Sequence, residues 1–89
     1  MPDRRLLLHY DYVADIVERR APHRPAHLEH LAAWKADGRL LLAGAVGEPP
    51  HGALFVFTED ADPAAFAAAD PYDAAGLVTA VRIEPWMTV

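Results

Sequence analysis

Residues 39–58 read RLLLAGAVGEPPHGALFVFT, and this stretch decides the fold. It holds two apolar runs, 39–46 and 53–58, on either side of a segment rich in glycine and proline. Such runs are typical of β-strands, and the residues between them are typical of a turn. We therefore expect a hairpin of two antiparallel strands joined by a turn over residues 47–52.

Both strands of this hairpin are apolar on both faces. Phe55 and Phe57 alternate with Leu54 and Val56, so each face of the second strand carries large apolar side chains. The first strand is apolar at nearly every position, which is typical of a strand that is covered on both sides. The sheet therefore needs a covering layer on each face.

A helix is expected on each side of the hairpin. Before it, residues 25–37 are good helix formers, with proline in the first turn and Gly38 as the residue after the last turn. After it, Asp62 and Pro63 open a second helix as N-cap and first helical residue. Asp70 and Pro71 repeat this pair, so the second helix is expected to bend or restart there and to end before residue 76.

Two outer strands complete the pattern. Residues 5–13 and 77–86 alternate with period two, and residues 15–20 form a short helical turn after the first of them. The order βαββαβ is the ferredoxin-like arrangement, an α+β fold. It predicts a four-stranded antiparallel sheet with two helices on one face.

A second copy of the chain is the expected cover for the other face. The 89 residues make one domain, 1–89, in which no segment remains to cover that face. The chain has no cysteine, so disulfides are excluded as a source of extra stability. We therefore expect a homodimer in which two sheets close on each other, a dimeric α+β barrel, with further pairing into a higher oligomer left open.

Composition excludes several classes of function. The formal net charge is −5, and an acidic chain without a basic patch is a poor binder of nucleic acid. No apolar run approaches the ~20 residues of a membrane helix, and residues 1–5 do not begin a signal peptide. We expect a cytoplasmic protein with neither nucleic acid nor membrane as a partner.

The sequence resembles the YCII-related (YciI-like) family over essentially its whole length. The pieces that carry the resemblance are RPAHL at 24–28, GRLLLAG at 38–44, ADPY at 69–72, AGL at 75–77 and Pro85. The resemblance implies a dimeric α+β barrel, related to small lactone isomerases and dehydrochlorinases of aromatic degradation. It also implies a His–Asp active site, which maps onto His27 and Asp70. The turn of the hairpin is shorter here than in many relatives.

His27 is also a candidate from its position alone. At about 100° per residue it lies on one arc with Leu31 and Trp34, so it faces the sheet. The partial positive charge of the helix N-terminus disfavours imidazolium, and a neutral imidazole is suited to act as a general base. The alternative is a core histidine that has one backbone partner.

Asp70 has two interpretations. It is an N-cap before proline, as Asp62 is, and a cap needs no other role. If it reaches His27, it orients the imidazole and stabilises the charged ring during proton transfer. The two roles are compatible, because a carboxylate has two oxygens.

Five further residues are candidates for substrate binding. Arg20 and Arg24 flank the start of the helix and could hold a carboxylate or phenolate, although they could equally be solvated or paired with acidic neighbours. Tyr10 and Tyr72 could offer hydroxyls to a pocket, or pack in the core. Gly44 is expected to meet a backbone requirement at a bulge.

No metal and no cofactor are expected. His23 lies before the helix, and His30 points about 60° away from His27, so the three histidines do not form a ligand set. His9 and His51 are expected to be ordinary strand and turn residues.

Two functional hypotheses remain. The first is a cofactor-free acid–base enzyme, an isomerase or dehydrochlorinase, in which His27 removes a proton from a small acidic or aromatic substrate. The second is a non-catalytic module that binds a small molecule or serves a larger system. A His27 within hydrogen-bond reach of Asp70 in a concavity would favour the enzyme, whereas a solvent-facing His27 more than ~6 Å away would favour the module.

Overall fold

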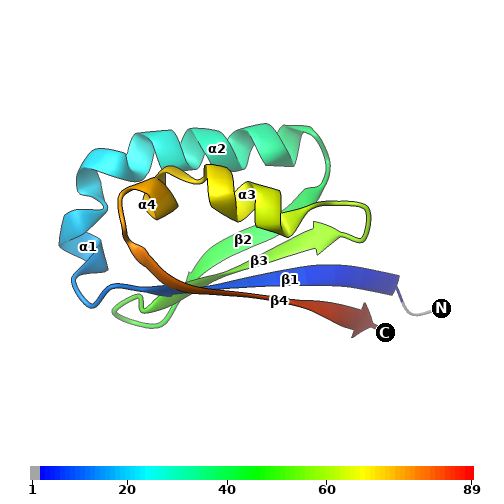
Figure 1. Ribbon diagram of the computed structural model, residues 1–89. Helices are drawn as coiled ribbons and strands as arrows, with labels where there is room; N and C mark the ends of the chain where they lie inside the picture. Colours follow the sequence, from blue (N-terminus) through cyan, green and yellow to red (C-terminus); the bar gives the residue numbers. More distant parts are fainter. Residues whose placement is uncertain (1–2) are drawn as a thin grey trace.

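Figure 1 shows the computed structural model, which describes residues 3–89. Met1 and Pro2, which belong to the N-terminal segment considered above, lie outside the described residues. The strands are β1 (Asp3–Tyr12), β2 (Leu40–Val46), β3 (Gly52–Thr58) and β4 (Val78–Thr88). The helical elements are α1 (Ile16–Arg19), the 3₁₀ turn η1 (Ala21–His23), α2 (Arg24–Ala36), α3 (Pro63–Ala69) and α4 (Pro71–Ala74).

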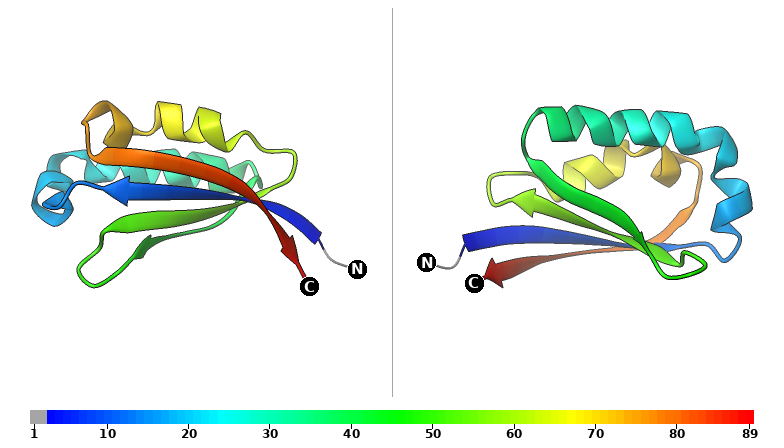
Figure 2. Two further views of the ribbon diagram at one scale, coloured as in Figure 1. Left: turned by 60° about the horizontal axis from the view of Figure 1, so that its bottom comes forward. Right: turned by 180° about the vertical axis from the view of Figure 1, so that it is seen from behind.

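The four strands form one antiparallel sheet in the order β2-β3-β1-β4. All helices lie on one side of this sheet, as the views in Figures 1 and 2 agree. Within residues 3–89 no element covers the opposite side, which is called the open face below. The α+β class, the βαββαβ order and the two main helices on one face are confirmed.

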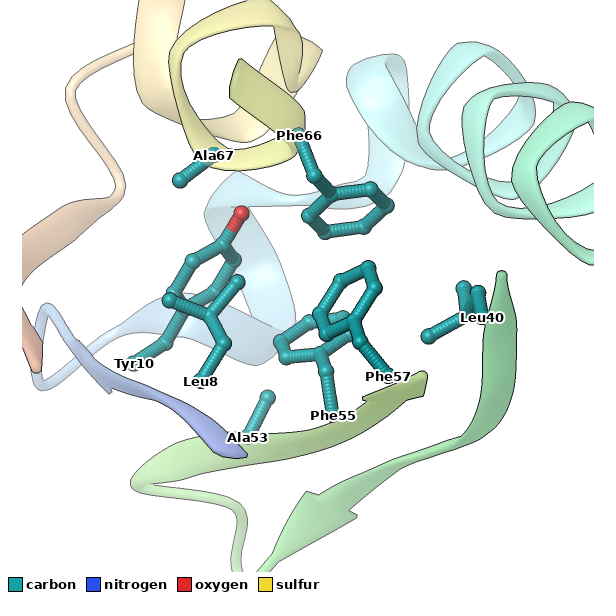
Figure 3. Close-up of a cluster of buried hydrophobic side chains, with 8 residues drawn as sticks. All are labelled: Leu8, Tyr10, Leu40, Ala53, Phe55, Phe57, Phe66 and Ala67. Atoms are coloured by element: carbon teal, nitrogen blue, oxygen red, sulfur yellow. The ribbon is translucent and has the colours of Figure 1, made fainter. Parts of the chain in front are cut away.

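The core lies between the sheet and α2 and α3. Leu8 of β1 stands opposite Phe55 of β3, and Leu6 stands opposite Phe57, so these side chains share the helix-covered face. Phe66 of α3 closes the cluster from above, with ring centroids 5.0 Å from Phe55 and 5.3 Å from Phe57 (Figure 3). Packed aromatic pairs at such distances anchor the helical layer on the sheet.

The two aspartate–proline pairs cap two separate helices. Asp62 accepts a hydrogen bond from the N–H of Ala65 at 3.1 Å, and Asp70 accepts one from the N–H of Tyr72 at 2.9 Å. Asp70 has an extended backbone (φ −70°, ψ 126°), because a residue before proline avoids helical dihedrals. The helix therefore stops at residue 69 and restarts at 71, as expected.

The last strand departs from the expected alternation. A bulge puts Tyr12 opposite Val78 and Asp11 opposite Ala80, which leaves Thr79 as an extra residue. Val78 therefore packs on the core with Tyr12, although simple alternation placed it on the face of Ala80. Leu77 precedes β4 and is buried in a second small cluster.

In the part of the chain that the structure describes, no helix has the length and apolar character needed to cross a membrane.

Candidate functional site

His27 and Asp70 meet beneath the helical layer. His27 is the fourth residue of α2, and Asp70 lies in the one-residue break between α3 and α4. The Nδ1 atom of His27 is 2.7 Å from Oδ1 of Asp70. The two residues are 5% and 1% exposed, so they are the buried polar pair of this layer.

Three donors surround the Asp70 carboxylate. Oδ1 accepts from His27 and from the N–H of Tyr72, and Oδ2 accepts from the Tyr10 hydroxyl at 2.8 Å. Figure 3 shows the Tyr10 hydroxyl directed from β1 towards the helical layer. Burial alone would raise the pKa of Asp70, but the hydrogen bonds from His27, Tyr72 and Tyr10 outweigh it and lower the pKa. Asp70 is therefore an ionised carboxylate at neutral pH.

The ionised partner determines which nitrogen of His27 carries hydrogen. A carboxylate only accepts hydrogen bonds, so Nδ1 of His27 must donate. In the neutral ring the lone pair is then on Nε2, which makes no hydrogen bond within residues 3–89. The pair is therefore arranged so that Nε2 can accept a proton while Nδ1 stays hydrogen-bonded to Asp70.

A cavity of about 130 Å³ opens beside this histidine. It lies between α2 on one side and β2 and β3 on the other. Its wall includes two arginines, the His27 ring, a tyrosine, and small or apolar side chains: Tyr12, Arg20, Arg24, His27, Leu28, Leu31, Ala43, Gly44, Ala45, Ala53 and Phe55. The arrangement combines a base, two cations and a mostly apolar floor.

Both candidate arginines line this cavity. Asp15 pairs with Arg19 at 3.6 Å, and none of the ion pairs found in residues 3–89 involves Arg20 or Arg24. Arg24 donates a hydrogen bond to the Tyr72 hydroxyl at 3.2 Å. The alternative expectation was that both arginines are solvated or paired with acidic neighbours. Since no such pair is found in the described residues, both guanidinium groups are available to an anion.

The hydroxyls of Tyr10 and Tyr72 both make hydrogen bonds within the protein. Tyr10 donates to Asp70 and Tyr72 accepts from Arg24, and neither residue lines the cavity beside His27. Burial, followed by the Asp70 charge, raises the pKa of Tyr10, which keeps its hydroxyl protonated. Of the two interpretations, core packing therefore fits both tyrosines, which are buried and contact other members of the site.

Tyr12 is the tyrosine that reaches the cavity, and sequence reasoning missed it. Its pKa is raised, first by burial and then by the Asp70 charge, so it is a neutral hydroxyl beside the two arginines. The signal was present, because Tyr12 continues the Leu8–Tyr10 face of β1. What the pattern did not show is that Tyr12 lies at the edge of the core, where it is only partly buried.

Gly44 lines the cavity but meets no backbone requirement. Its φ is not positive, and a Cβ added there would have nothing within 4 Å. The bulge in β2 lies between Leu40 and Leu42. The expected backbone requirement at a bulge was therefore wrong for Gly44, whereas Gly38 and Gly76 do have positive φ after their helices.

The remaining histidines have other surroundings. His30 donates Nε2–H to the backbone carbonyl of Phe66 at 2.8 Å. His9 is 2.8 Å from Glu84 on the open face, and together with His51 it borders a separate hollow of about 220 Å³ at the hairpin end.

Comparison with known proteins gives the family. The YCII-related domain matches residues 4–87. The chain belongs to the YCII-related family. Two curated relatives, each called Protein YciI, come from Escherichia coli O6:H1 and Shigella flexneri. Each is 39% identical over 89 residues, which cover 85% of this chain and 89% of the relative.

Solved structures of other proteins share the fold of this family member. The 5-chloro-2-hydroxyhydroquinone dehydrochlorinase (TftG) from Burkholderia phenoliruptrix, in complex with 2,5-dihydroxybenzoquinone, has a TM-score of 0.74 at 21% identity. The match covers 92% of both chains. Protein Atu4242 from Agrobacterium tumefaciens has a TM-score of 0.57 at 8% identity, covering 93% of this chain and 90% of that one. At these identities the likeness establishes the fold alone.

Proposed function

We propose that this YciI-like chain is a cofactor-free acid–base enzyme that acts on a small acidic or aromatic molecule. In this proposal His27 is the general base, Asp70 orients it, and Arg20 and Arg24 hold the anionic part of the substrate. The reaction is an isomerisation or an elimination that begins with removal of a proton next to a carbonyl or from an enolisable ring.

One observation carries the proposal. An ionised, buried Asp70 holds Nδ1 of His27 at 2.7 Å, in a ring that forms part of a cavity wall. The distance is far below the ~6 Å that would favour a non-catalytic module. A purely structural histidine also needs no cavity with two arginines on its exposed side.

The proton transfer follows from the tautomer. Nε2 of His27 takes the substrate proton, and the ring becomes an imidazolium whose charge is stabilised by Asp70. The electron pair left on the substrate moves towards an oxygen, where the arginines and the Tyr12 hydroxyl stabilise the developing oxyanion. In an isomerisation His27 returns the proton to another carbon. In an elimination the electron pair forms a double bond and expels the leaving group as an anion.

The size of the cavity bounds the substrate. An apolar cavity of about 150 Å³ is known to accommodate benzene, so about 130 Å³ with an open mouth suits one ring or a short acid. Substituents would extend through the open mouth. The similarly folded dehydrochlorinase bound to 2,5-dihydroxybenzoquinone makes hydroxylated aromatics the first compounds to try.

The test is turnover by the wild type and by His27→Gln. 5-Chloro-2-hydroxyhydroquinone is offered first and chloride release is measured, and related enolisable acids are screened by hydrogen–deuterium exchange. We expect His27→Gln to lose at least about 100-fold in rate, the usual contribution of a general base. His23→Gln, just before α2 and outside the cavity, is the control and should keep the rate.

Two outcomes would overturn the proposal. If His27→Gln turns over an identified substrate at the wild-type rate, His27 is not the base. If the wild type binds aromatic acids but neither turns them over nor exchanges their protons, the binding-module hypothesis is favoured.

A further inference from the structure

We propose that Tyr72 is a positioning residue that holds the base and the anion-binding arginine in one fixed arrangement. The inference rests on the proposed function, because it assigns a role in preparing the same site. It differs from the sequence expectation, in which Tyr72 offered a hydroxyl to the ligand.

Tyr72 contacts three members of the site through three different groups. Its backbone N–H donates to Oδ1 of Asp70 at 2.9 Å. Its ring stacks on the His27 ring, with centroids 3.7 Å apart and planes 5° from parallel. Its hydroxyl accepts a hydrogen bond from Nη1 of Arg24 at 3.2 Å.

The stack supplies an orientation that the Asp70 bond does not. The terminal torsion of histidine is broad, so a single bond at Nδ1 leaves the imidazole able to rock about that bond. A parallel ring at 3.7 Å blocks rocking on one side. Because Nε2 is the reacting atom, the plane of the ring decides where the lone pair is aimed.

Tyr72 is itself held rigidly. It is 1% exposed and packs with Ile16 and Leu77, and Tyr12 lies edge-on to its ring at 6.0 Å. Because the Tyr72 ring is fixed, the place of α4 determines the orientation of the His27 imidazole. The short helix α4 begins here because Asp70 and Pro71 restart the helix at this point.

The hydroxyl adds a second constraint, on the arginine. Arg24 has a long, flexible side chain. Without a partner it would sample several rotamers, and its charge would have no fixed position in the cavity. The bond to Tyr72 holds one guanidinium nitrogen at a set place relative to His27. A ligand whose anionic group binds Arg24 then presents its neighbouring C–H at a defined distance from Nε2.

The two constraints are separable by substitution. Tyr72→Phe keeps the ring and the backbone N–H and removes only the bond to Arg24. Tyr72→Leu keeps the N–H and an apolar side chain and removes the stacked ring. Circular dichroism establishes that each variant is folded before the site is measured.

The first experiment measures benzoate affinity by NMR titration, with neutral benzamide as the matched probe. For Tyr72→Phe we expect benzoate to bind 3- to 10-fold more weakly, with benzamide binding unchanged and the His27 ring resonances at their wild-type positions. In an Arg24→Gln background, Tyr72→Phe should have no further effect. Two results would overturn the arginine part of the inference. One is an equal benzoate affinity of wild type and Tyr72→Phe. The other is that Tyr72→Phe weakens benzoate binding by the same factor in the Arg24→Gln background as in the wild type.

The second experiment records the ¹⁵N and ¹H resonances of the His27 ring as pH is varied. For Tyr72→Leu we expect exchange broadening of the ring signals and a His27 titration curve different from that of the wild type. Identical ring signals and an identical curve would overturn the positioning of His27. If Tyr72→Leu does not fold, Tyr72→Met is measured in the same way.

Failure of the proposed function has a different signature. It would appear in the wild type, as no benzoate binding or as turnover that is independent of His27. The His27 ring signals of the Tyr72 variants would still show whether Tyr72 orients the imidazole.

Discussion

Asp70 belongs both to the fold and to the site. Its Oδ1 atom caps α4 through the N–H of Tyr72 and also accepts from His27, while Oδ2 accepts from Tyr10. The cap and the partner of His27 are therefore the same carboxylate. Asp62 provides the comparison, because it caps α3 at an exposed position and has no buried partner.

Asp70 should make the stability of the protein depend on acid. Its pKa is lower in the folded protein than the ~3.9 of an unfolded aspartate, so the unfolded chain takes up this proton first as pH falls. The contribution of Asp70 to the free energy of unfolding is complete above about pH 5. It is lost as pH falls from about 4 through the lower pKa that Asp70 has in the folded protein. We expect Asp70→Asn to lower the free energy of unfolding by about 1–3 kcal/mol at pH 7 and to weaken its acid dependence.

Urea denaturation followed by tryptophan fluorescence between pH 3 and pH 7 measures this effect. Asp62→Asn is the matched control, since it changes an exposed cap and should leave the acid slope as in the wild type. Parallel stability curves for wild type and Asp70→Asn from pH 5 to pH 3 would contradict the assignment.

At the residue scale, the sequence predicted the His27–Asp70 pair better than it predicted the residues around that pair. Helical periodicity placed His27 inward, and the resemblance singled out Asp70 from two similar caps. Tyr10 and Tyr12 share one face of β1, so alternation could not decide which of them lies in the core and which borders the cavity. That depends on how far α2 extends over the sheet, a tertiary property.

At the element scale, local chemistry was predictable and pairing was not. The two Asp–Pro pairs predicted two helix starts, because capping involves residues within one turn. The bulge at Thr79 was missed, because the register of β4 is determined by hydrogen bonds with β1, far away in the sequence. The missed bulge is the reason why Val78 packs on the core and does not share the face of Ala80.

Two glycines of the β2–β3 hairpin should differ in how much a substitution by alanine lowers the free energy of unfolding. A Cβ at Gly52 would lie 2.3 Å from the backbone oxygen of Tyr10, whereas a Cβ at Gly44 would meet nothing within 4 Å. We expect Gly52→Ala to cost about 1–3 kcal/mol of unfolding free energy, as overpacking does, and Gly44→Ala to stay within about 0.5 kcal/mol. Thermal and urea unfolding of the two variants test this, and an equal loss in both would show that close contact at Gly52 is not the cause.

At the scale of the whole molecule, the open face is the feature that a single chain leaves unexplained. Leu42 is 65% exposed there, and Val46 and Trp86 are also exposed. On the same face, Glu84 contacts both His9 and Arg82. Four strands present roughly 600 Å² in projection, near the ~800 Å² that each partner buries in a standard interface. We propose that a second copy of the chain covers this face.

Leu42→Lys tests the dimer. A lysine in the middle of an apolar interface would be desolvated without a partner, so we expect the variant to sediment as a monomer where the wild type sediments as a dimer. Val17→Lys, at an exposed position on α1, is the control and should leave the dimer intact. A monomeric wild type at micromolar concentration would contradict the proposal.

The central claim is that the cavity beside His27 binds a small organic anion, and amide NMR mapping tests it most directly. Labelled wild-type protein is titrated with 2,5-dihydroxybenzoquinone and with benzoate. We predict that the largest shift changes fall on Tyr12, Arg20, Arg24, His27 and Gly44, and that Arg24→Gln weakens binding of both compounds at least about 10-fold. Shift changes centred instead on the hollow at His9 and His51, or binding unaffected by Arg24→Gln, would contradict the claim.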